Sequence, residues 1–242
     1  MMGLICYRDA GEKNGTRMLC GVNFCAVYVT RGEGVLAQFS AKRAVKYLKK
    51  RRVRQAVFPK GHPNAPVFAR LGILPPDERP LRQVKTAAIV RCAMGKLGLR
   101  AEHARIALIA DRLSAALEAS AISLARDVRY LMLCAPGDAH IARAIRWDCG
   151  ASVSVCAREN IRADLAAVFS GIAPRCRCPV LELENAALGV SYGAEDLPPE
   201  AVLWEENDLL CALYLSGALR EESISVKDVI FPAKAAENTK LP

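Results

Sequence analysis

The sequence predicts an α/β protein built on a mainly parallel β-sheet, with a smaller and strongly basic α/β lobe at its amino end. Between residues 105 and 156, short apolar runs alternate with amphipathic stretches, as in right-handed βαβ units. Residues 1–100 hold 20 Lys and Arg against 5 Asp and Glu, net +15, whereas residues 101–242 hold 14 against 20, net −6. This asymmetry indicates an anionic partner for the first part, or attraction between the two parts.

We expect four parts in the 242 residues, a length that suits one large domain or two small ones. Residues 1–80 form the basic lobe, and residues 81–98 form a bridging helix. Residues 99–232 form the parallel-sheet domain, and residues 233–242 form a loose tail.

In the basic lobe, residues 1–17 lack periodicity and predict an irregular end. The apolar residues of 19–30, the glycine turn at 31–34 and the run 35–39 predict a β-hairpin. Ser40 then caps a helix whose apolar stripe is Ala41, Ala44, Val45 and Leu48. Residues 53–58 predict a strand, and six prolines in 59–80 predict a connection without long regular structure.

The second part begins with the helix at 81–98, which Gly98 ends. Residues 105–110 predict a strand, Ser114 caps a helix to about Arg126, and residues 128–134 predict the next strand. Asp138 caps a further helix that Gly150 ends. The remaining expected elements are strands at 151–156, 164–169 and 180–183, and a last helix that carries Leu209, Leu210 and Leu213 and ends at Gly217.

The order of elements from about residue 100 to 230 resembles the Rossmann-type dinucleotide-binding superfamily. Together with the preceding lobe and helix, it resembles the two-lobed plan of the shikimate dehydrogenase class. The resemblance implies an NAD or NADP cofactor, yet residues 110–116 contain no glycine where the superfamily has G-x-G-x-x-G. Asp111 also places a carboxylate beside the helix N-terminus where a phosphate would sit. We therefore expect no cofactor, and NAD or NADP remains the alternative.

The loop at 134–140 is the better candidate for a ligand, because it combines a glycine, a helix N-terminus and a histidine in the first helical turn. In the simpler interpretation, Asp138 only caps the helix and His140 is an exposed residue. The candidate cofactor-binding residues from the two loops are Arg112, Ser114, Gly137, Asp138 and His140.

A basic helix is the second candidate site. Eight cations fall within residues 42–54: Lys42, Arg43, Lys46, Lys49, Lys50, Arg51, Arg52 and Arg54. Such a helix resembles a phosphate-backbone footprint, which makes nucleic-acid binding one hypothesis. A solvated basic helix is the simpler one, because base-reading motifs and stacking aromatic residues are absent from the sequence.

The ten cysteines lie in apolar runs, and no secretory leader precedes them, so we expect reduced thiols in the cytoplasm. Cys176 and Cys178 form a C-x-C, which lacks the paired spacing of a zinc site, and we expect no metal. Arg175 and Arg177 would stabilise a redox-active thiolate there. The alternative is two ordinary reduced cysteines. No apolar run reaches the roughly 20 residues that a membrane span needs.

Catalytic residues cannot be assigned, since the chain has only three histidines and lacks the common hydrolase, metalloprotease and P-loop motifs. The sequence therefore favours a non-catalytic binding or regulatory protein whose partner is a protein or a small anion. Two alternatives stay open. One is a divergent NAD(P)-dependent oxidoreductase, and the other is nucleic-acid binding through residues 42–54.

Overall fold

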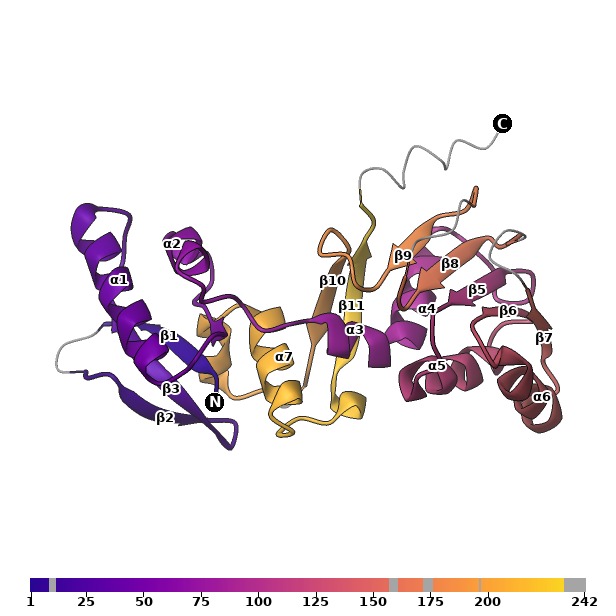
Figure 1. Ribbon diagram of the computed structural model, residues 1–242, viewed down its shortest axis with the longest axis horizontal. Coiled ribbons are helices and arrows are strands. Elements are labelled where there is room, and N and C mark those ends of the chain that lie inside the picture. The colour runs from indigo at the N-terminus through magenta and orange to yellow at the C-terminus, as the bar shows by residue number, and fades with distance from the viewer. Residues whose placement is uncertain (9–11, 157–160, 172–175, 196, 233–242) are drawn as a thin grey trace. The chain divides into compact units, whose positions relative to one another are not determined.

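The computed structural model describes residues 1–8, 12–156, 161–171, 176–195 and 197–232 (Figure 1). The chain forms two compact units. The first combines Met1–Glu78 with Tyr192–Ile224, and the second combines Arg79–Ser191 with the segment that begins at Ser225. The expected tail at 233–242 lies outside the described residues. Within the described part of the chain, no helix is both long and apolar enough to cross a membrane.

The second unit contains a five-stranded sheet in the order β7-β6-β5-β8-β9, with every neighbouring pair parallel. This is the order 3-2-1-4-5 of a doubly wound Rossmann-like sheet. The α/β fold class with a mainly parallel sheet is therefore confirmed. The strands are β5 (Arg105–Ile109), β6 (Tyr130–Cys134), β7 (Ser152–Val155), β8 (Leu165–Val168) and β9 (Val180–Glu182).

The helices of this unit connect and cover the strands. They are α3 (Arg79–Val84), α4 (Thr86–Lys96), α5 (Ala115–Ala125) and α6 (Asp138–Cys149). The helix expected at 81–98 is thus two helices that meet at Lys85, and Gly98 follows the second with a φ of +65°. A separate two-stranded sheet pairs β10 (Gly189–Gly193) with β11 (Ser225–Ile230), and the Lys96 ammonium donates to the Val229 carbonyl at 2.7 Å.

The first unit contains a four-stranded sheet in the order β2-β3-β1-β4. β1 (Gly3–Tyr7) is parallel to β3 (Val22–Val29) and to β4 (Ala56–Val57), and β2 (Gly15–Leu19) is antiparallel to β3. Its helical segments are α1 (Val35–Lys50), α2 (Ala65–Arg70), η2 (Pro199–Leu203), α7 (Glu206–Leu215) and η3 (Glu221–Ser223).

Two cores fill the two faces of this sheet, because side chains alternate along each strand. Ile5 of β1 packs in a cluster with Ala41, Val45 and Leu48 of α1. Leu4, the preceding residue, packs on the other face in a cluster with residues of α7. α1 and α7 therefore cover opposite faces of one sheet.

The structure of the amino end corrects three expectations. Residues 3–7 are not irregular but form the strand between β3 and β4, and Leu4 and Ile5 are fully buried. Such a short apolar run without alternation suits a parallel strand covered on both faces. The hairpin joins β2 to β3 through Cys20 and Gly21, which both have positive φ, whereas residues 35–39 begin α1. Ser40 lies inside that helix, where its Oγ accepts from the backbone N–H of Thr30 at 3.2 Å.

The expected range of the parallel-sheet domain also differs from the structure, because residues 192–224 belong to the first unit. Trp204 is buried with Leu4 and Phe24 of the first unit, and its indole N–H donates to the Ile5 carbonyl at 2.9 Å. The apolar face of α7 is thus buried on a sheet whose strands lie at the other end of the sequence.

Candidate functional site

The loop between β5 and α5 is occupied by its own side chains. Ser114 is the N-cap of α5, and its Oγ accepts from the backbone N–H of Leu117 at 3.2 Å. Arg112 is exposed. The side chain of Leu113 reaches the next loop, where its Cδ1 lies 3.0 Å from the position that a Cβ on Gly137 would take. This loop therefore presents a leucine where a dinucleotide site needs open backbone.

The loop between β6 and α6 differs from its expected capping. Gly137, with a φ of +77°, is the N-cap of α6, and Asp138 is the first helical residue. The Asp138 carboxylate accepts from the backbone N–H of Ala135 at 3.3 Å. Asp138 is thus not the N-cap: it stabilises the turn before the helix. His140 is exposed in the first turn.

A hollow of about 250 Å³ lies at the carboxyl ends of these strands, lined by Ala110, Asp111, Cys134, Ala135, Pro136, Asp138 and Cys156. Of the five candidate cofactor-binding residues, only Asp138 lines it. The two carboxylates of Asp111 and Asp138 oppose a diphosphate at this edge. The residues present therefore do not fit the pyrophosphate of NAD or NADP.

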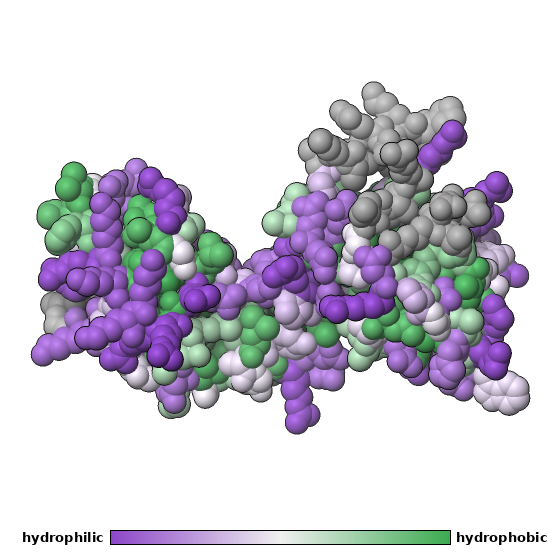
Figure 2. Space-filling model, in the orientation of Figure 1, coloured by the Kyte–Doolittle hydropathy of each residue, from purple (hydrophilic) through white to green (hydrophobic). Residues whose placement is uncertain are grey.

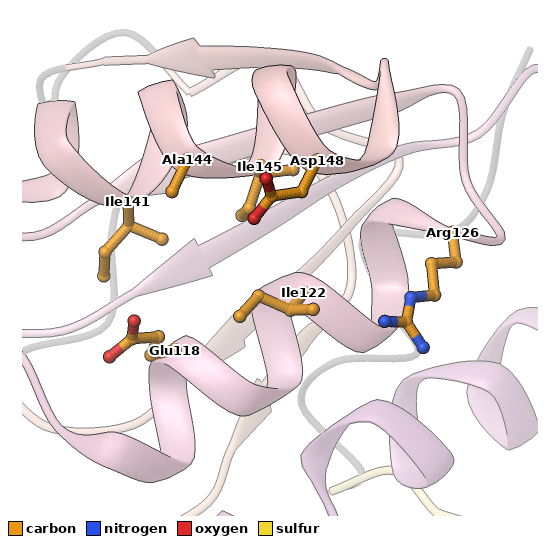
Figure 3. A pocket seen from close by; sticks show the side chains of 7 residues that line it. All are labelled: Glu118, Ile122, Arg126, Ile141, Ala144, Ile145 and Asp148. Atoms are coloured by element: carbon orange, nitrogen blue, oxygen red, sulfur yellow. The ribbon is translucent and has the colours of Figure 1, made fainter.

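A second hollow, of about 300 Å³, lies between α5 and α6 (Figure 3). Its apolar residues are Ile122, Ile141, Ala144 and Ile145, and Glu118, Arg126 and Asp148 are the charged ones. The groove is a seam between two helices packed side by side. It lacks the convergent polar groups that orient a small ligand.

The cations of the basic helix all lie on the surface. Lys42, Arg43, Lys46, Lys49 and Lys50 are exposed on α1, and Arg51, Arg52 and Arg54 are exposed just after it. Figure 2 shows hydrophilic side chains over much of this part of the first unit. The guanidinium of Arg51 lies 4.7 Å from the centre of the Tyr47 ring, and that of Arg43 lies 5.7 Å from the Phe39 ring, so two of the cations are partly engaged.

Cys176 and Cys178 are close neighbours, with 3.2 Å between their sulfur atoms. A hydrogen bond from the Cys178 thiol lowers the pKa of Cys176 to about 6, and the same interaction raises the pKa of Cys178. Arg177 is exposed, and Arg175 lies outside the described residues. The thiolate is therefore stabilised by the neighbouring thiol, where the sequence suggested the flanking arginines. No group of three or more His, Cys, Asp or Glu among the described residues could hold a metal ion.

The largest of these hollows, about 530 Å³, lies in the first unit; we call it the N-terminal pocket. Its lining includes residues that follow the carboxyl ends of β1, β3 and β4, which is where ligands bind in open α/β sheets. They are Ile5, Cys6, Tyr7, Arg8, Glu12, Arg17, Tyr28, Arg31, Pro59, Lys60, Val202, Leu203 and Trp204.

Charge in the N-terminal pocket is predominantly positive. Arg8, Arg31 and Lys60 each follow the end of a parallel strand, and Arg17 comes from β2. Among the described lining residues, Glu12 is the one carboxylate. Glu200, outside that lining, pairs with Arg17. The described cations still exceed these two carboxylates, which makes the pocket attractive to an anion.

Aromatic side chains form the walls and hold two of the cations in place. The guanidinium of Arg31 lies 4.6 Å from the centre of the Tyr7 ring, and that of Arg17 lies 5.4 Å from the Trp204 ring. Arg17 also forms an ion pair of 2.9 Å with Glu200. Because these contacts fix the guanidinium groups before a ligand arrives, less conformational entropy is lost on binding.

The Cys6 thiol and the tyrosine hydroxyls of this pocket are neutral groups. Burial raises the pKa of the Cys6 thiol to about 11, and burial also raises the pKa of Tyr7 and of Tyr28. A thiol that stays protonated at neutral pH is a poor nucleophile. The Tyr28 hydroxyl remains available to donate a hydrogen bond, whereas the Tyr7 hydroxyl lies 3.1 Å from His62 Nδ1. The pocket is thus equipped to bind an anion more than to attack a substrate.

Sequence reasoning did not find this site. Its cations come from four separate stretches of chain, and no spacing joins them. Two signals were present: the excess of Lys and Arg in residues 1–100, and the position of Arg8 and Arg31 just after apolar runs. The first was assigned to the helix at 42–54. The second depends on recognising residues 3–7 as a strand.

No protein-family model matches the sequence. No curated protein matches it either. Among solved structures, the chain is similar to a shikimate 5-dehydrogenase-like protein, with 12% identity over 70% of this chain and 65% of the other and a TM-score of 0.26. It is also similar to a chorismate mutase/shikimate 5-dehydrogenase fusion protein from Clostridium acetobutylicum, with 10% identity over 70% and 66% of the two chains and a TM-score of 0.24.

In both cases the chain spans slightly less than two thirds of the other protein. TM-scores this low carry no information about activity or ligand. The sheet order and the N-terminal pocket define a class: a Rossmann-like α/β protein with a cationic pocket in its first unit.

Proposed function

We propose that this protein binds a small organic anion, a planar carboxylate or a phosphate ester, in the N-terminal pocket. The observation that carries the proposal is the convergence of Arg8, Arg17, Arg31 and Lys60 on one aromatic-walled pocket. A volume of about 530 Å³ suits a ligand of small-molecule size. The guanidinium groups bind the anion, and the ring of Tyr28 packs against a flat ligand body.

Binding without chemistry is the better-supported role. The thiol and hydroxyl groups of the pocket are held protonated by burial, and the Rossmann-like edge of the second unit carries carboxylates where a cofactor phosphate would lie. The second unit then serves as a scaffold or as a surface for a protein partner. Since the nine cysteines whose side chains the structure describes form no disulfide, we place the protein in the cytoplasm.

Isothermal titration with benzoate, with inorganic phosphate and with a phosphate monoester tests the proposal. We expect at least one of the three to bind at micromolar to low millimolar concentration, more weakly as salt is added. Arg31→Gln should weaken that binding by roughly 10-fold or more, because a hydrogen bond to a charged group contributes about 1.5–3 kcal/mol. Lys46→Gln, an exposed cation of α1 outside the pocket, is the matched control and should change nothing. Absence of binding by all three probes would overturn the proposal.

Nucleic-acid binding by α1 is the second candidate function, favoured by the exposure of all eight cations of residues 42–54. Replacing Lys49, Lys50, Arg51 and Arg52 together by Glu should then abolish retention on RNA or heparin. Retention by the unaltered protein should fall steeply with salt. Unchanged retention of the variant would exclude this helix as the binding surface.

The oxidoreductase alternative has less physical support, because the residues at the β5 and β6 ends do not fit a diphosphate. This alternative nevertheless makes a direct prediction. The purified protein should carry NAD(P)H absorbance near 340 nm or gain thermal stability when NAD or NADP is added. Failure of both measurements would remove it.

A further inference from the structure

A pair of cysteines at the carboxyl ends of β6 and β7 is independent of the proposed anion site. Cys134 is the last residue of β6, and Cys156 directly follows β7. Their sulfur atoms lie 2.6 Å apart, and no disulfide joins them. This separation is only about 0.6 Å longer than a covalent disulfide bond.

The backbone already has the geometry that a crosslink needs. β6 and β7 are parallel with Leu133 opposite Val155, so the next position places Cys134 beside Cys156. The ladder continues there, because the backbone N–H of Cys156 donates to the Leu133 carbonyl at 3.0 Å. Neighbouring strands are about 4.8 Å apart, which falls inside the 4.4–6.8 Å range of Cα separations in disulfides. The strand separation is therefore compatible with a disulfide.

The pair can be reached from solvent, and its two members differ in exposure. Both line the hollow of about 250 Å³ at the end of the sheet. Cys134 is 3% exposed, whereas Cys156 is partly exposed. A small oxidant therefore meets Cys156 first, with the buried partner directly behind it.

We propose that Cys134 and Cys156 form a reversible disulfide by exchange with a low-molecular-weight disulfide. The Cys156 thiolate attacks one sulfur of the oxidant, and that sulfur's partner leaves as a thiolate. The mixed disulfide on Cys156 is then attacked by the Cys134 thiolate, which forms the Cys134–Cys156 bond and expels the second half of the oxidant as a thiolate. The two protons lost by the cysteines go to the two departing thiolates. Overall, two protein thiols are oxidised to one disulfide, and one small disulfide is reduced to two thiols.

The crosslink has a defined structural effect. It joins the ends of two adjacent strands and encloses α6, which connects them. It also changes the surface of the hollow from two thiols to one disulfide. The expected consequence is slower local opening of α6, which is measurable as slower amide hydrogen exchange in that helix.

The C-x-C pair differs in geometry and serves as an internal comparison. Cys176 and Cys178 are two residues apart, so their disulfide would have to close within one short turn of chain, which strains the bond. Cys176 has the lower pKa and can still react with the oxidant, but we expect it to stop at the mixed disulfide.

The experiment treats the folded, reduced full-length protein with excess oxidised glutathione, blocks the remaining thiols by alkylation and digests with trypsin. Cleavage after Arg143 and Arg146 separates Cys134 from Cys156, so their disulfide appears as two linked peptides. We expect this crosslink in wild-type protein and its loss after dithiothreitol. Because Cys149 shares the tryptic peptide of Cys156, Cys149→Ser must retain the crosslink.

Single variants test the order of the steps. Cys134→Ser should accumulate glutathione on Cys156, because the resolving thiol is missing. Cys156→Ser should leave the buried Cys134 largely unmodified, and Cys92→Ser, a partly buried cysteine outside the pair, should behave as wild type. The proposal is overturned if wild-type protein gives no linked Cys134 and Cys156 peptides, or if glutathione stays on Cys156 while Cys134 remains alkylated.

Discussion

The Tyr7 hydroxyl and the His62 Nδ1 lie 3.1 Å apart, which joins a residue of the N-terminal pocket to a histidine that is only 7% exposed. His62 lies among the rings of Tyr7, Phe58 and Phe68. Its Nε2 has no hydrogen-bond partner in the described part of the chain. Burial lowers the pKa of His62 from 6.5, so the imidazole is neutral in the folded protein at pH 7.

This relationship predicts that His62 makes the protein sensitive to acid. The unfolded chain binds a proton near pH 6.5, whereas the folded chain binds it only at lower pH. The contribution of neutral His62 to stability is therefore complete above pH 6.5. It is lost as the pH falls from 6.5 through the lowered pKa of His62 in the folded protein. Through His62, the protein is therefore less stable at pH 5.5 than at pH 7.5. Urea unfolding at pH 7.5 and 5.5 should show that His62→Phe removes this loss, whereas the exposed His103→Gln does not.

Asp208 predicts a pH dependence of the opposite sign. Burial, together with the charges of Glu78 and Glu205, raises its pKa from 3.8 to about 7, and a backbone hydrogen bond at Phe58 offsets part of the shift. Because the folded pKa is the higher one, stability is greatest below pH 3.8 and is lost as the pH rises to about 7. Asp208→Asn should therefore stabilise the protein at pH 8, by about 2 kcal/mol once solvent screening is allowed for.

The control for Asp208 is an exposed carboxylate. Glu222→Gln should leave the free energy of unfolding unchanged at pH 8 and at pH 5. If Asp208→Asn gave the same gain at both pH values, lost titration would not be its cause. Asp208 and His62 change the free energy of unfolding in opposite directions between pH 5.5 and 7.5. The effect of each residue must therefore be measured as the difference in that free energy between variant and wild type.

We expect residues 192–224, which include Trp204, to stabilise the first unit. Its indole N–H donates to the Ile5 carbonyl across 199 residues of sequence, and its ring packs with Leu4 and Phe24. Trp204→Phe leaves that buried carbonyl without its donor and removes part of the packing. We expect a loss of about 2–4 kcal/mol in denaturant unfolding. A loss below about 0.5 kcal/mol would show that the segment contributes little.

The same contact explains which parts of the fold the sequence could predict. The strands and helices between residues 105 and 156 are set by local signals, namely apolar runs, the Ser114 cap and the glycine stop at Gly150, and the structure contains them. Burial of Trp204 against Ile5 has no local signal, because neither residue's surroundings reveal the other. The N-terminal pocket escaped sequence analysis for the same reason, since β1 and the η2 segment meet only after folding.

Capping shows a finer limit of the same reasoning. Asp138 is a residue type that often serves as an N-cap. In the structure, however, Gly137 is the N-cap, with a positive φ, and α6 begins at Asp138. The Asp138 carboxylate then accepts a hydrogen bond from the backbone N–H of Ala135. A cap residue and a first-turn residue differ by one position, and only the backbone conformation decides between them.

Gly3 predicts that close packing, more than any side-chain bond, fixes β1 beside β4. Gly3 is the register partner of Ala56, and a Cβ at Gly3 would lie 3.0 Å from the Ala56 Cβ and 3.1 Å from Leu48 Cδ2. Gly3→Ala should therefore destabilise the protein by about 1–3 kcal/mol through overpacking. The swap Gly3→Ala with Ala56→Gly moves the methyl group to the other strand at nearly constant volume. In urea titration the double variant should lose less than the sum of the two single variants, because the two positions compete for one space. Simple additivity would show that the contact is not limiting.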